Sequence, residues 1–313
     1  GVDFGMDSEV TDPIFVPYDP ADPAGQYLKN YGAVVVRCGA TEIGGPSEED
    51  NHPLHGTMTN GSFTNLRILI GEDTGRLVVA GDFDDSSRDV EGRHSYGATA
   101  GVVFTLGSGI IEIPTTIKNC YEQPLMVARM DHVNDRLIDG AEIIYSGRFR
   151  SILETDLDSL SDEFIAFREK VRGSPEILDR ITPDLVLNPD IVAYYDMFPD
   201  EDGFAHALMI DPDGYGHSVM QETERFPIGV RWMRRIPEGA SLGASPVRNA
   251  CGFNLPSTGK VEGYAASLRG GELVEVLSGE IFTSGTRFGI FTPDEVEGER
   301  RTIDDIMAGV GGT

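Results

Sequence analysis

Short apolar runs separated by turn residues fill most of this 313-residue chain, and they constrain its fold more than any other feature. Between residues 31 and 150 they recur at the roughly eight-to-twelve-residue spacing that is typical of β-sandwiches. Many are rich in Val, Ile, Thr and Phe, which favour strands, and 38 glycines and 18 prolines supply turn residues. The pattern predicts an all-β protein. Because no low-complexity linker divides the chain, we expect a single domain over residues 1–313.

The clearest predicted hairpin joins residues 67–70 to residues 76–81. The turn between them, Glu72-Asp73-Thr74-Gly75, has the polar residues and the glycine that commonly reverse a chain. Other strands are expected at residues 33–36, 97–106, 109–119, 124–130, 191–198, 205–210, 229–233, 264–268, 273–277 and 281–290.

Residues 155–185 depart from the strand pattern. Leu160, Phe164, Phe167 and Val171 recur at helical spacing and share one face, Ser161 is available as a cap, and Gly-Ser-Pro follows at residues 173–175. This predicts one or two short surface helices around residues 158–180. Residues 1–30, rich in Asp and Pro, are expected to form an extended entry. Residues 294–313 are expected to form a loose tail or a short docking helix.

The charge of the chain limits its partners. It has 52 acidic and 25 basic residues, a formal net charge of −27 and a pI near 4.4. Such a field repels phosphates and anionic lipids, so neither nucleic acid nor a membrane is an expected partner. The scarcity of lysine fits either a salt-rich cytoplasm or an Arg-favouring genome, and the sequence does not decide between them.

Three cysteines, Cys38, Cys120 and Cys251, are an odd number without close spacing. This argues against a disulfide framework and for a reducing compartment, and we expect a cytoplasmic protein. Cys38 and Cys120 lie in or beside apolar runs and are expected to be buried. No apolar run approaches the ~18 residues of a spanning helix, and the first residues do not resemble a signal peptide.

Two histidine clusters are the strongest functional signal. His52 and His55 follow the strand at residues 33–36, and His55 precedes Gly56, which lets a ligand approach the backbone. His132 ends another apolar run, and strand alternation places it on the same face as Asn134. Near pH 7 a neutral imidazole can accept or donate a proton. We predict that both clusters meet in one groove that binds a sugar, with three candidate catalytic residues: His132, His55 and Asp131.

A divalent metal site is the alternative use of these residues. His52, His55 and Asp131 supply enough ligands, although an H-x-x-H pair in a loop without a cysteine partner is a weak signal. No other cofactor is expected, because the glycine-rich stretches at residues 39–45 and 309–312 lack the strand-to-helix layout of a nucleotide loop. A nucleophilic triad is disfavoured because the sequence has no G-x-S-x-G.

Candidate substrate-binding residues are charged, amide or aromatic groups. Arginines are candidates because cations are scarce against so much acid. The only tryptophan, Trp232, lies in an alternating strand and can stack on the C–H face of a sugar ring, with a plain core position as its alternative. The predicted set is Arg37, Asn134, Trp232, Arg248, Arg67 and Glu222.

Taken together, the order GAVVVRCGATEIGGP, PLHG, KNCYEQPLMVARMDHVN, FPIGVRWM, SLGASPVRNACGF and LRGGELVEVLSGE resembles the aldose 1-epimerase (galactose mutarotase) superfamily, in particular a poorly characterised branch. The resemblance covers most of residues 1–292 and implies a β-supersandwich with its groove on a concave sheet. It also implies that His55 binds the substrate and that His132 protonates the ring oxygen.

The resemblance fails at the residue that would be the catalytic base. The family uses a glutamate near the C-terminus, and this chain reads Ser245-Pro246 where Glu-Pro is usual. Arg37 and Asp135 are further departures. A serine hydroxyl does not replace a carboxylate as a general base near neutral pH, so another acid is needed in the groove. The candidates are Asp131, Asp135 and Glu222.

Three functions remain open at this point. The leading hypothesis is a sugar isomerase or epimerase with His132 as general acid and His55 as the orienting residue. The alternatives are a lyase acting on a sugar derivative, with or without a metal, and a carbohydrate-binding protein without catalysis. In each case the partner is a small sugar or sugar derivative, and a homo-oligomer is possible.

Overall fold

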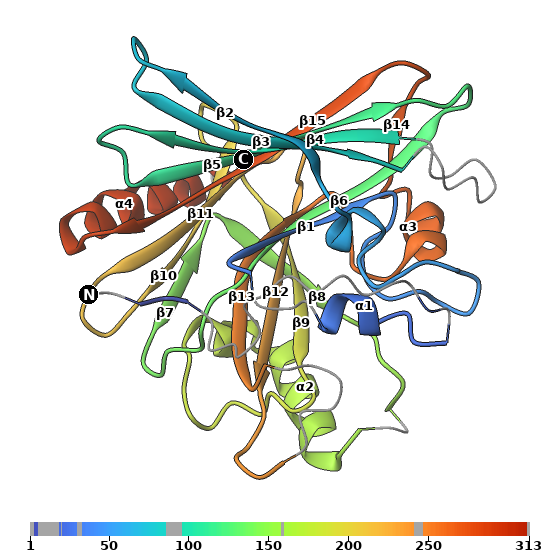
Figure 1. The fold of residues 1–313 in the computed structure, drawn as a ribbon. Helices are drawn as coiled ribbons and strands as arrows, with labels where there is room; N and C mark the ends of the chain where they lie inside the picture. The colour runs from blue at the N-terminus through green and yellow to red at the C-terminus, as the bar shows by residue number, and fades with distance from the viewer. Residues whose placement is uncertain are drawn as a thin grey trace.

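The structure is a computed structural model that describes residues 3–5, 19, 21–29, 33–85, 96–157, 160–240 and 247–311. Two large antiparallel sheets form a sandwich (Figure 1). The first sheet has the order β1 (Val35–Ala40), β6 (Leu125–Val133), β13 (Asn249–Ser257), β12 (Ile228–Arg235), β9 (Ile191–Met197) and β8 (Gly147–Ile152), and β14 (Val274–Val276) also pairs with β6.

The second sheet has the order β2 (Thr64–Gly71), β3 (Arg76–Asp84), β4 (Tyr96–Thr105), β5 (Ile110–Asn119), β15 (Ile281–Phe291), β11 (Gly216–Glu222), β10 (Phe204–Ile210) and β7 (Glu142–Tyr145). The predicted all-β sandwich is therefore confirmed. The hairpin expected at residues 67–81 is β2–β3, and the strands expected between residues 97 and 130 are β4, β5 and β6.

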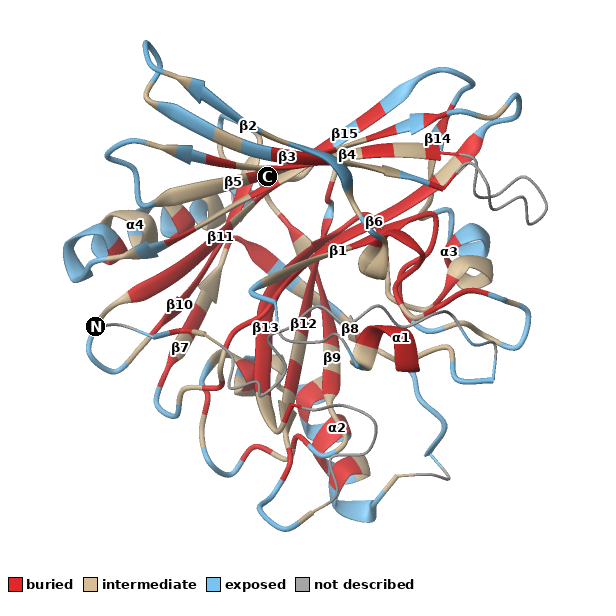
Figure 2. Ribbon diagram, viewed as in Figure 1, coloured by how far each residue is buried: buried red, intermediate tan, exposed pale blue. Residues whose placement is uncertain are grey.

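The main hydrophobic core is built from both sheets, and buried residues follow the strands (Figure 2). Val133 and Phe253 contribute from the first sheet, and Ala207 and Val219 contribute from the second. Strand alternation sends one set of side chains into this core and the other set to the outer face. The core fixes β6 in place, and β6 carries His132.

The helix expected around residues 158–180 is α2 (Asp162–Gly173), followed by the 3-10 turn η3 (Pro175–Asp179). The hydroxyl of Ser161 accepts a hydrogen bond from the Phe164 N–H at 3.2 Å, which caps the first turn. Phe164, Phe167 and Val171 are buried on the face that their spacing predicted. This prediction is confirmed.

Near the end of the chain the structure forms the helix α4 (Pro293–Val310). A capping box joins Thr292 and Glu295, and Val296 and Ile303 pack against Leu208 of β10. Of the two forms expected for residues 294–313, the loose tail is wrong and a docked helix is observed. At the other end, the described residues 21–29 include the short helix α1 (Gly25–Leu28), so the entry is not extended there.

The strand expected at residues 264–268 is instead the helix α3 (Tyr264–Gly270). Gly263 and Gly271 bound it with φ values of 87° and 66°, backbone conformations that suit glycine and that stop a strand. Alanines at the second and third positions favour the helix. A short 3-10 turn, η1 (Met58–Asn60), completes the described elements.

Strand β2 lies at the edge of the second sheet and is apolar on both faces. Leu66, Ile68, Leu69 and Ile70 are 75%, 67%, 55% and 73% exposed. A run of this kind on an edge strand is uncommon in a monomer, because its backbone groups and side chains can both pair with another chain.

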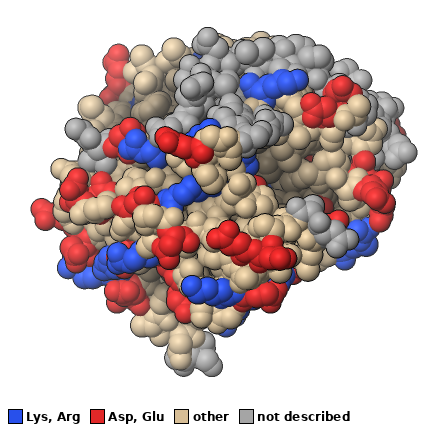
Figure 3. Space-filling view, turned by 90° about the horizontal axis from the view of Figure 1, so that it is seen from below, with Lys and Arg blue, Asp and Glu red and all other residues tan. Residues whose placement is uncertain are grey.

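The cysteines are free, and Cys38 and Cys251 are buried. Cys120 is exposed, which corrects the expectation that it is buried, because it follows the last residue of β5. Within the part of the chain that is described, no helix combines the length and the apolarity that a bilayer crossing requires. Acidic side chains are spread over the face shown in Figure 3, with basic ones between them.

Candidate functional site

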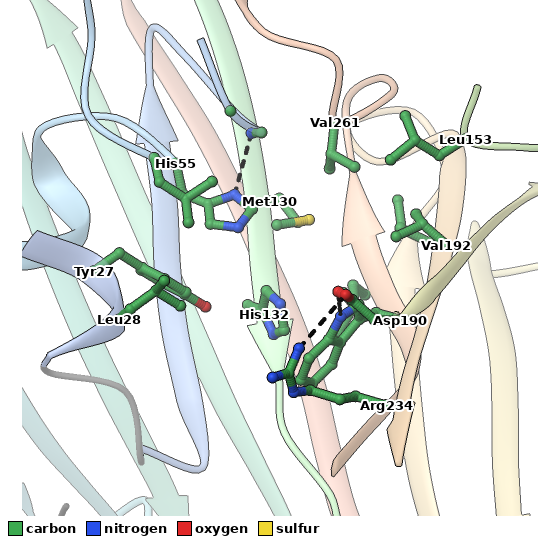
Figure 4. Close-up of a pocket in the computed structure, with 16 residues that line it drawn as sticks. Tyr27, Leu28, His55, Met130, His132, Leu153, Asp190, Val192, Arg234 and Val261 are labelled. Atoms are coloured by element: carbon green, nitrogen blue, oxygen red, sulfur yellow. Dashed lines mark hydrogen bonds and ion pairs between the residues drawn. The ribbon is translucent and has the colours of Figure 1, made fainter. Parts of the chain in front are cut away.

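A cavity of about 210 Å³ lies against the first sheet and contains both predicted histidines, His55 and His132. We call it the His pocket. Figure 4 shows Tyr27, Leu28 and His55 on one side and Met130 and His132 of β6 in the centre. On the other side it shows Leu153, Asp190, Val192, Arg234 and Val261. Its lining is Tyr27, Leu28, Gly44, Gly45, Leu54, His55, Met130, His132, Leu153, Asp190, Val192, Val230, Trp232, Arg234, Leu255 and Val261.

The backbone holds His55 in an unusual conformation. Its φ is 62°, in the left-handed region that L-residues rarely adopt. Its N–H donates to the Gly44 carbonyl at 2.9 Å, and its own carbonyl accepts from the Gly39 N–H at 2.9 Å and from the Thr59 hydroxyl at 2.6 Å. Strain of this kind persists where surrounding contacts fix it, and it gathers at functional sites. These contacts aim the imidazole into the pocket.

The same loop also sets the tautomer of His55. The Gly44 N–H donates to Nδ1 at 3.1 Å, so in the neutral ring the proton is on Nε2. Gly56, with a φ of 82°, permits the close turn, because a Cβ there would lie 2.6 Å from the Gly39 carbonyl oxygen. His55 therefore presents a fixed N–H donor.

The two imidazoles meet as the sequence predicted. Their ring centroids are 5.6 Å apart, with planes nearly perpendicular at 79°. The Tyr27 ring lies 4.8 Å from His55 and 6.3 Å from His132, and Trp232 lies 5.5 Å from His132. Aromatic faces thus border the histidine pair on both sides.

Both histidines are neutral near pH 7. Burial lowers the pKa of His55 well below its usual value, and the neighbouring rings of His132 and His52 lower it further. Burial also lowers the pKa of His132 to about 4, against a smaller opposing effect of a hydrogen bond with Asn134. A resting His132 can therefore accept a proton more readily than it can donate one.

Asp190, which was not predicted from the sequence, places a carboxylate in the pocket. Its Oδ2 accepts a hydrogen bond from Trp232 Nε1 at 2.5 Å, and its Oδ1 lies 3.6 Å from Arg234 Nη1. In Figure 4 Asp190 and Arg234 lie on the wall opposite Tyr27 and His55. Trp232 lies in the pocket as predicted, and Arg234, two residues along β12, shares its face.

Asp131 does not reach the pocket, although the sequence placed it there. It faces the space between the sheets, where its Oδ1 accepts from Arg129 Nη2 and its Oδ2 from the Thr286 hydroxyl, both at 2.7 Å. Neither Asp131 nor Arg129 is accessible to solvent. Successive strand residues point to opposite faces, so a pocket that holds His132 excludes Asp131.

Arg37 is likewise turned into the sandwich. It stands opposite Asp131 in the β1–β6 ladder, and its guanidinium donates to the Thr115 hydroxyl and to the Gly101 carbonyl of the second sheet. Burial lowers its pKa, and the charge of Asp131 opposes that effect. Its role is to connect the two sheets, which corrects its assignment to substrate binding.

The other predicted binding residues also lie outside the pocket. Asn134 donates to the Ala33 and His132 carbonyls, at 2.8 and 3.2 Å. Arg248 donates to the carbonyls of residues 236 and 237, at the end of β12. Arg67 pairs with Asp82 on the β2–β3 hairpin, and Glu222 ends β11 in the second sheet. Ser245 lies outside the described residues.

The side chains predicted as an alternative metal site, His52, His55 and Asp131, do not come together. His52 Nδ1 is 2.9 Å from the Pro53 carbonyl and its Nε2 is 3.9 Å from Asp50, whereas Asp131 faces the sandwich interior. Among the residues that the structure describes, no three His, Cys, Asp or Glu side chains form a group that could hold a metal ion.

No protein-family model matches the chain, and no curated protein sequence matches it. Solved structures do match. A candidate aldose 1-epimerase from Klebsiella pneumoniae has a TM-score of 0.78 at 15% identity, over 97% of this chain and 75% of that one. A galactose 1-epimerase from Lactobacillus acidophilus has a TM-score of 0.54 at 13% identity, over 92% and 84%.

A galactose mutarotase-like protein from Clostridium acetobutylicum matches with a TM-score of 0.52 at 14% identity, over 83% of this chain and 79% of that one. At these identities the likeness shows a common fold. The β-supersandwich that the resemblance implied is therefore confirmed.

Proposed function

We propose that this protein is a sugar epimerase or isomerase that moves a proton between oxygen atoms of an aldose or keto-sugar in the His pocket. One observation carries the proposal: two buried, neutral imidazoles from distant parts of the chain lie with ring centroids 5.6 Å apart in one cavity. The names of the structural neighbours, aldose and galactose 1-epimerases, support a sugar as the substrate. The cavity volume of about 210 Å³ is below the roughly 300–1,000 Å³ of most small-molecule sites, which favours a ligand no larger than a single sugar ring.

His132 is the group to which we assign the proton transfer. Because burial lowers its pKa to about 4, it starts as a base rather than as the general acid expected from the sequence. It accepts the proton of the anomeric hydroxyl as the bond between the anomeric carbon and the ring oxygen breaks. It then returns this proton to the ring oxygen, which gives the open-chain sugar. Closure on the other face of the carbonyl reverses these steps and leaves His132 neutral.

His55 orients the substrate in this scheme. Its Nδ1 is occupied by the Gly44 N–H, so its Nε2–H is a donor of fixed direction for a sugar oxygen. A hydrogen bond to the ring oxygen favours departure of that oxygen while negative charge develops on it. His55 needs no change of protonation state to do this.

The opposite wall supplies binding groups. Trp232, Val192 and Leu255 offer apolar surface to the C–H face of a sugar ring. The Asp190 carboxylate can accept a hydrogen bond from a sugar hydroxyl. Asp190 is the acid that we assign in place of the family glutamate.

The test is anomerisation of freshly dissolved single anomers across a panel of aldoses, followed by polarimetry and by NMR. His132→Ala should lower the enzymatic rate by roughly two to four orders of magnitude, the usual contribution of acid–base catalysis. Asp190→Asn should also lower it. Glu222→Gln is the matched control, because it removes a carboxylate outside the pocket, and it should keep the wild-type rate.

The outcomes separate the proposal from its alternatives. A His132→Ala variant that keeps more than a tenth of the wild-type rate would contradict the assigned role. Saturable sugar binding without acceleration of any panel member would identify a carbohydrate-binding protein. A metal-assisted lyase requires His52, His55 and Asp131 to converge, and these side chains point in different directions.

A further inference from the structure

A second cavity opens at one end of the space between the sheets. Its volume is about 380 Å³, within the roughly 300–1,000 Å³ range of small-molecule sites. None of the described residues that line it also lines the His pocket. It lies where β6, β11 and β15 approach each other, and we call it the end cavity.

A buried Asp135–His217 pair forms the polar part of this cavity. The Nδ1 of His217 lies 2.5 Å from Asp135 Oδ1, and the two residues are 3% and 1% exposed. The Asp135 backbone is fixed by reciprocal hydrogen bonds with Cys251, each 2.7 Å long.

The second oxygen of Asp135 has no donor. Oδ2 is buried and accepts no hydrogen bond from any described residue. Buried carboxylate oxygens are normally satisfied, because removing a charged group from water without a partner is unfavourable. Asp135 lines the cavity, so a ligand there can supply the missing donor.

The walls of the cavity indicate what that ligand is. Phe4, Phe288 and Ile111 provide apolar surface, and the rings of Phe4 and Phe288 lie 5.8 and 6.0 Å from His217. None of the described lining residues is a lysine or an arginine, and the remaining charged one, Asp3, is acidic. Asp3 lies 3.5 Å from Arg136, which leaves Asp135 as the buried charge of the cavity. Carboxylate and aromatic faces together favour an organic cation.

We propose that the end cavity binds a small organic amine in its ammonium form. The ammonium group donates to Asp135 Oδ2, and its carbon chain lies against Phe4, Phe288 and Ile111. A metal ion is less suitable, since Asp135 and His217 supply only two ligands and the described residues contain no group of three. The site is independent of the sugar chemistry proposed for the His pocket.

The test compares n-butylammonium with 1-butanol and butyrate by isothermal titration calorimetry at constant ionic strength. The full chain should bind n-butylammonium saturably and should bind neither of the other probes. Asp135→Asn, which keeps the shape and removes the charge, should weaken n-butylammonium binding roughly 10- to 100-fold. Asp190→Asn is the matched control, because it removes a carboxylate from the other pocket, and it should keep wild-type affinity.

A second measurement uses the unaltered protein, in case Asp135→Asn does not fold. Intermolecular NOEs from the butyl protons to the rings of Phe4 and Phe288 are expected. Equal binding of 1-butanol would show a merely apolar cavity, and no saturable binding of n-butylammonium would show one occupied by water. NOEs to Tyr27 and Trp232 instead would place the amine in the His pocket. Each of these three results overturns the proposal.

Discussion

Replacing Asp131 by asparagine separates a structural role from a catalytic one. In the wild type the Asp131 carboxylate is the counter-ion of Arg129, at 2.7 Å, and it also opposes the effect of burial on the pKa of Arg37. Asp131→Asn leaves the guanidinium groups of Arg129, which is buried, and Arg37, which is partly buried, to repel each other without a balancing charge. Removing one partner of a buried ion pair typically costs about 3–5 kcal/mol, out of a total stability of about 5–15 kcal/mol.

At roughly 2 °C per kcal/mol for a chain of this size, Tm should fall by about 6–10 °C. Differential scanning calorimetry measures the shift, and the anomerisation rate is measured well below the transition. We expect a destabilised protein whose folded fraction keeps its rate. Asp190→Asn should show the opposite pattern, with a small change of Tm and a lost rate. If Asp131→Asn keeps the wild-type Tm but loses the rate, the separation of structural and catalytic roles is refuted.

Three further predictions follow from the same structure. Because burial lowers the pKa of His132 to about 4, the anomerisation rate should be constant around neutral pH and should fall to half near pH 4. A midpoint between pH 6 and 7 would contradict the assignment of the proton transfer to His132. Burial lowers the pKa of His206, but hydrogen bonds with Glu299 and Asp200 outweigh burial and raise this pKa above its usual value. The contribution of protonated His206 to the free energy of unfolding is therefore complete below about pH 6.5 and is lost as the pH rises through the raised pKa. His206→Gln should remove that slope from a plot of Tm against pH, and an unchanged slope would show another source. A homo-oligomer should pair β2 with β2 of a second copy, since residues 64–71 contain no acid that would add to the repulsion between chains of net charge −27. Ile68→Lys should then give a monomer by light scattering. An equal mass for the wild type and the variant would exclude β2 as the interface.

Local sequence predicted those elements whose pattern is strong on its own. Two short apolar runs on either side of a polar turn that ends in glycine identified β2 and β3, and the spacing from Phe164 to Val171 identified α2. β13 was missed because Asn249–Ser257 contains Asn, Cys, Gly and Pro, which do not favour strands. Its burial between β6 and β12 supplies the stabilisation that its composition lacks.

The site was predictable only in part, for a similar reason. His55 and His132 stood out because each has a distinctive local setting. Asp190 has none: it precedes β9, and it reaches the pocket because β9 pairs with β12, where Val192 stands opposite Trp232. Pairing between distant strands is not readable from one sequence.

One misplacement and one omission had a signal that was available in the sequence. Period-two alternation, applied to His132 and Asn134, also sends Asp131 to the opposite face. The same rule places Arg234 beside Trp232, although no role was assigned to Arg234. The inner position of Arg37 could not be predicted from alternation alone, because it depends on which face of β1 meets the second sheet.

Exchange NMR measures whether one histidine pair, His55 and His132, acts on one sugar. The rate of interconversion of the two anomers of a responsive aldose is measured with the wild type, with His132→Gln and with His55→Gln, at equal protein concentration. We expect fast exchange for the wild type, exchange near the uncatalysed rate for His132→Gln and weaker substrate binding for His55→Gln. Wild-type exchange in both variants would contradict it.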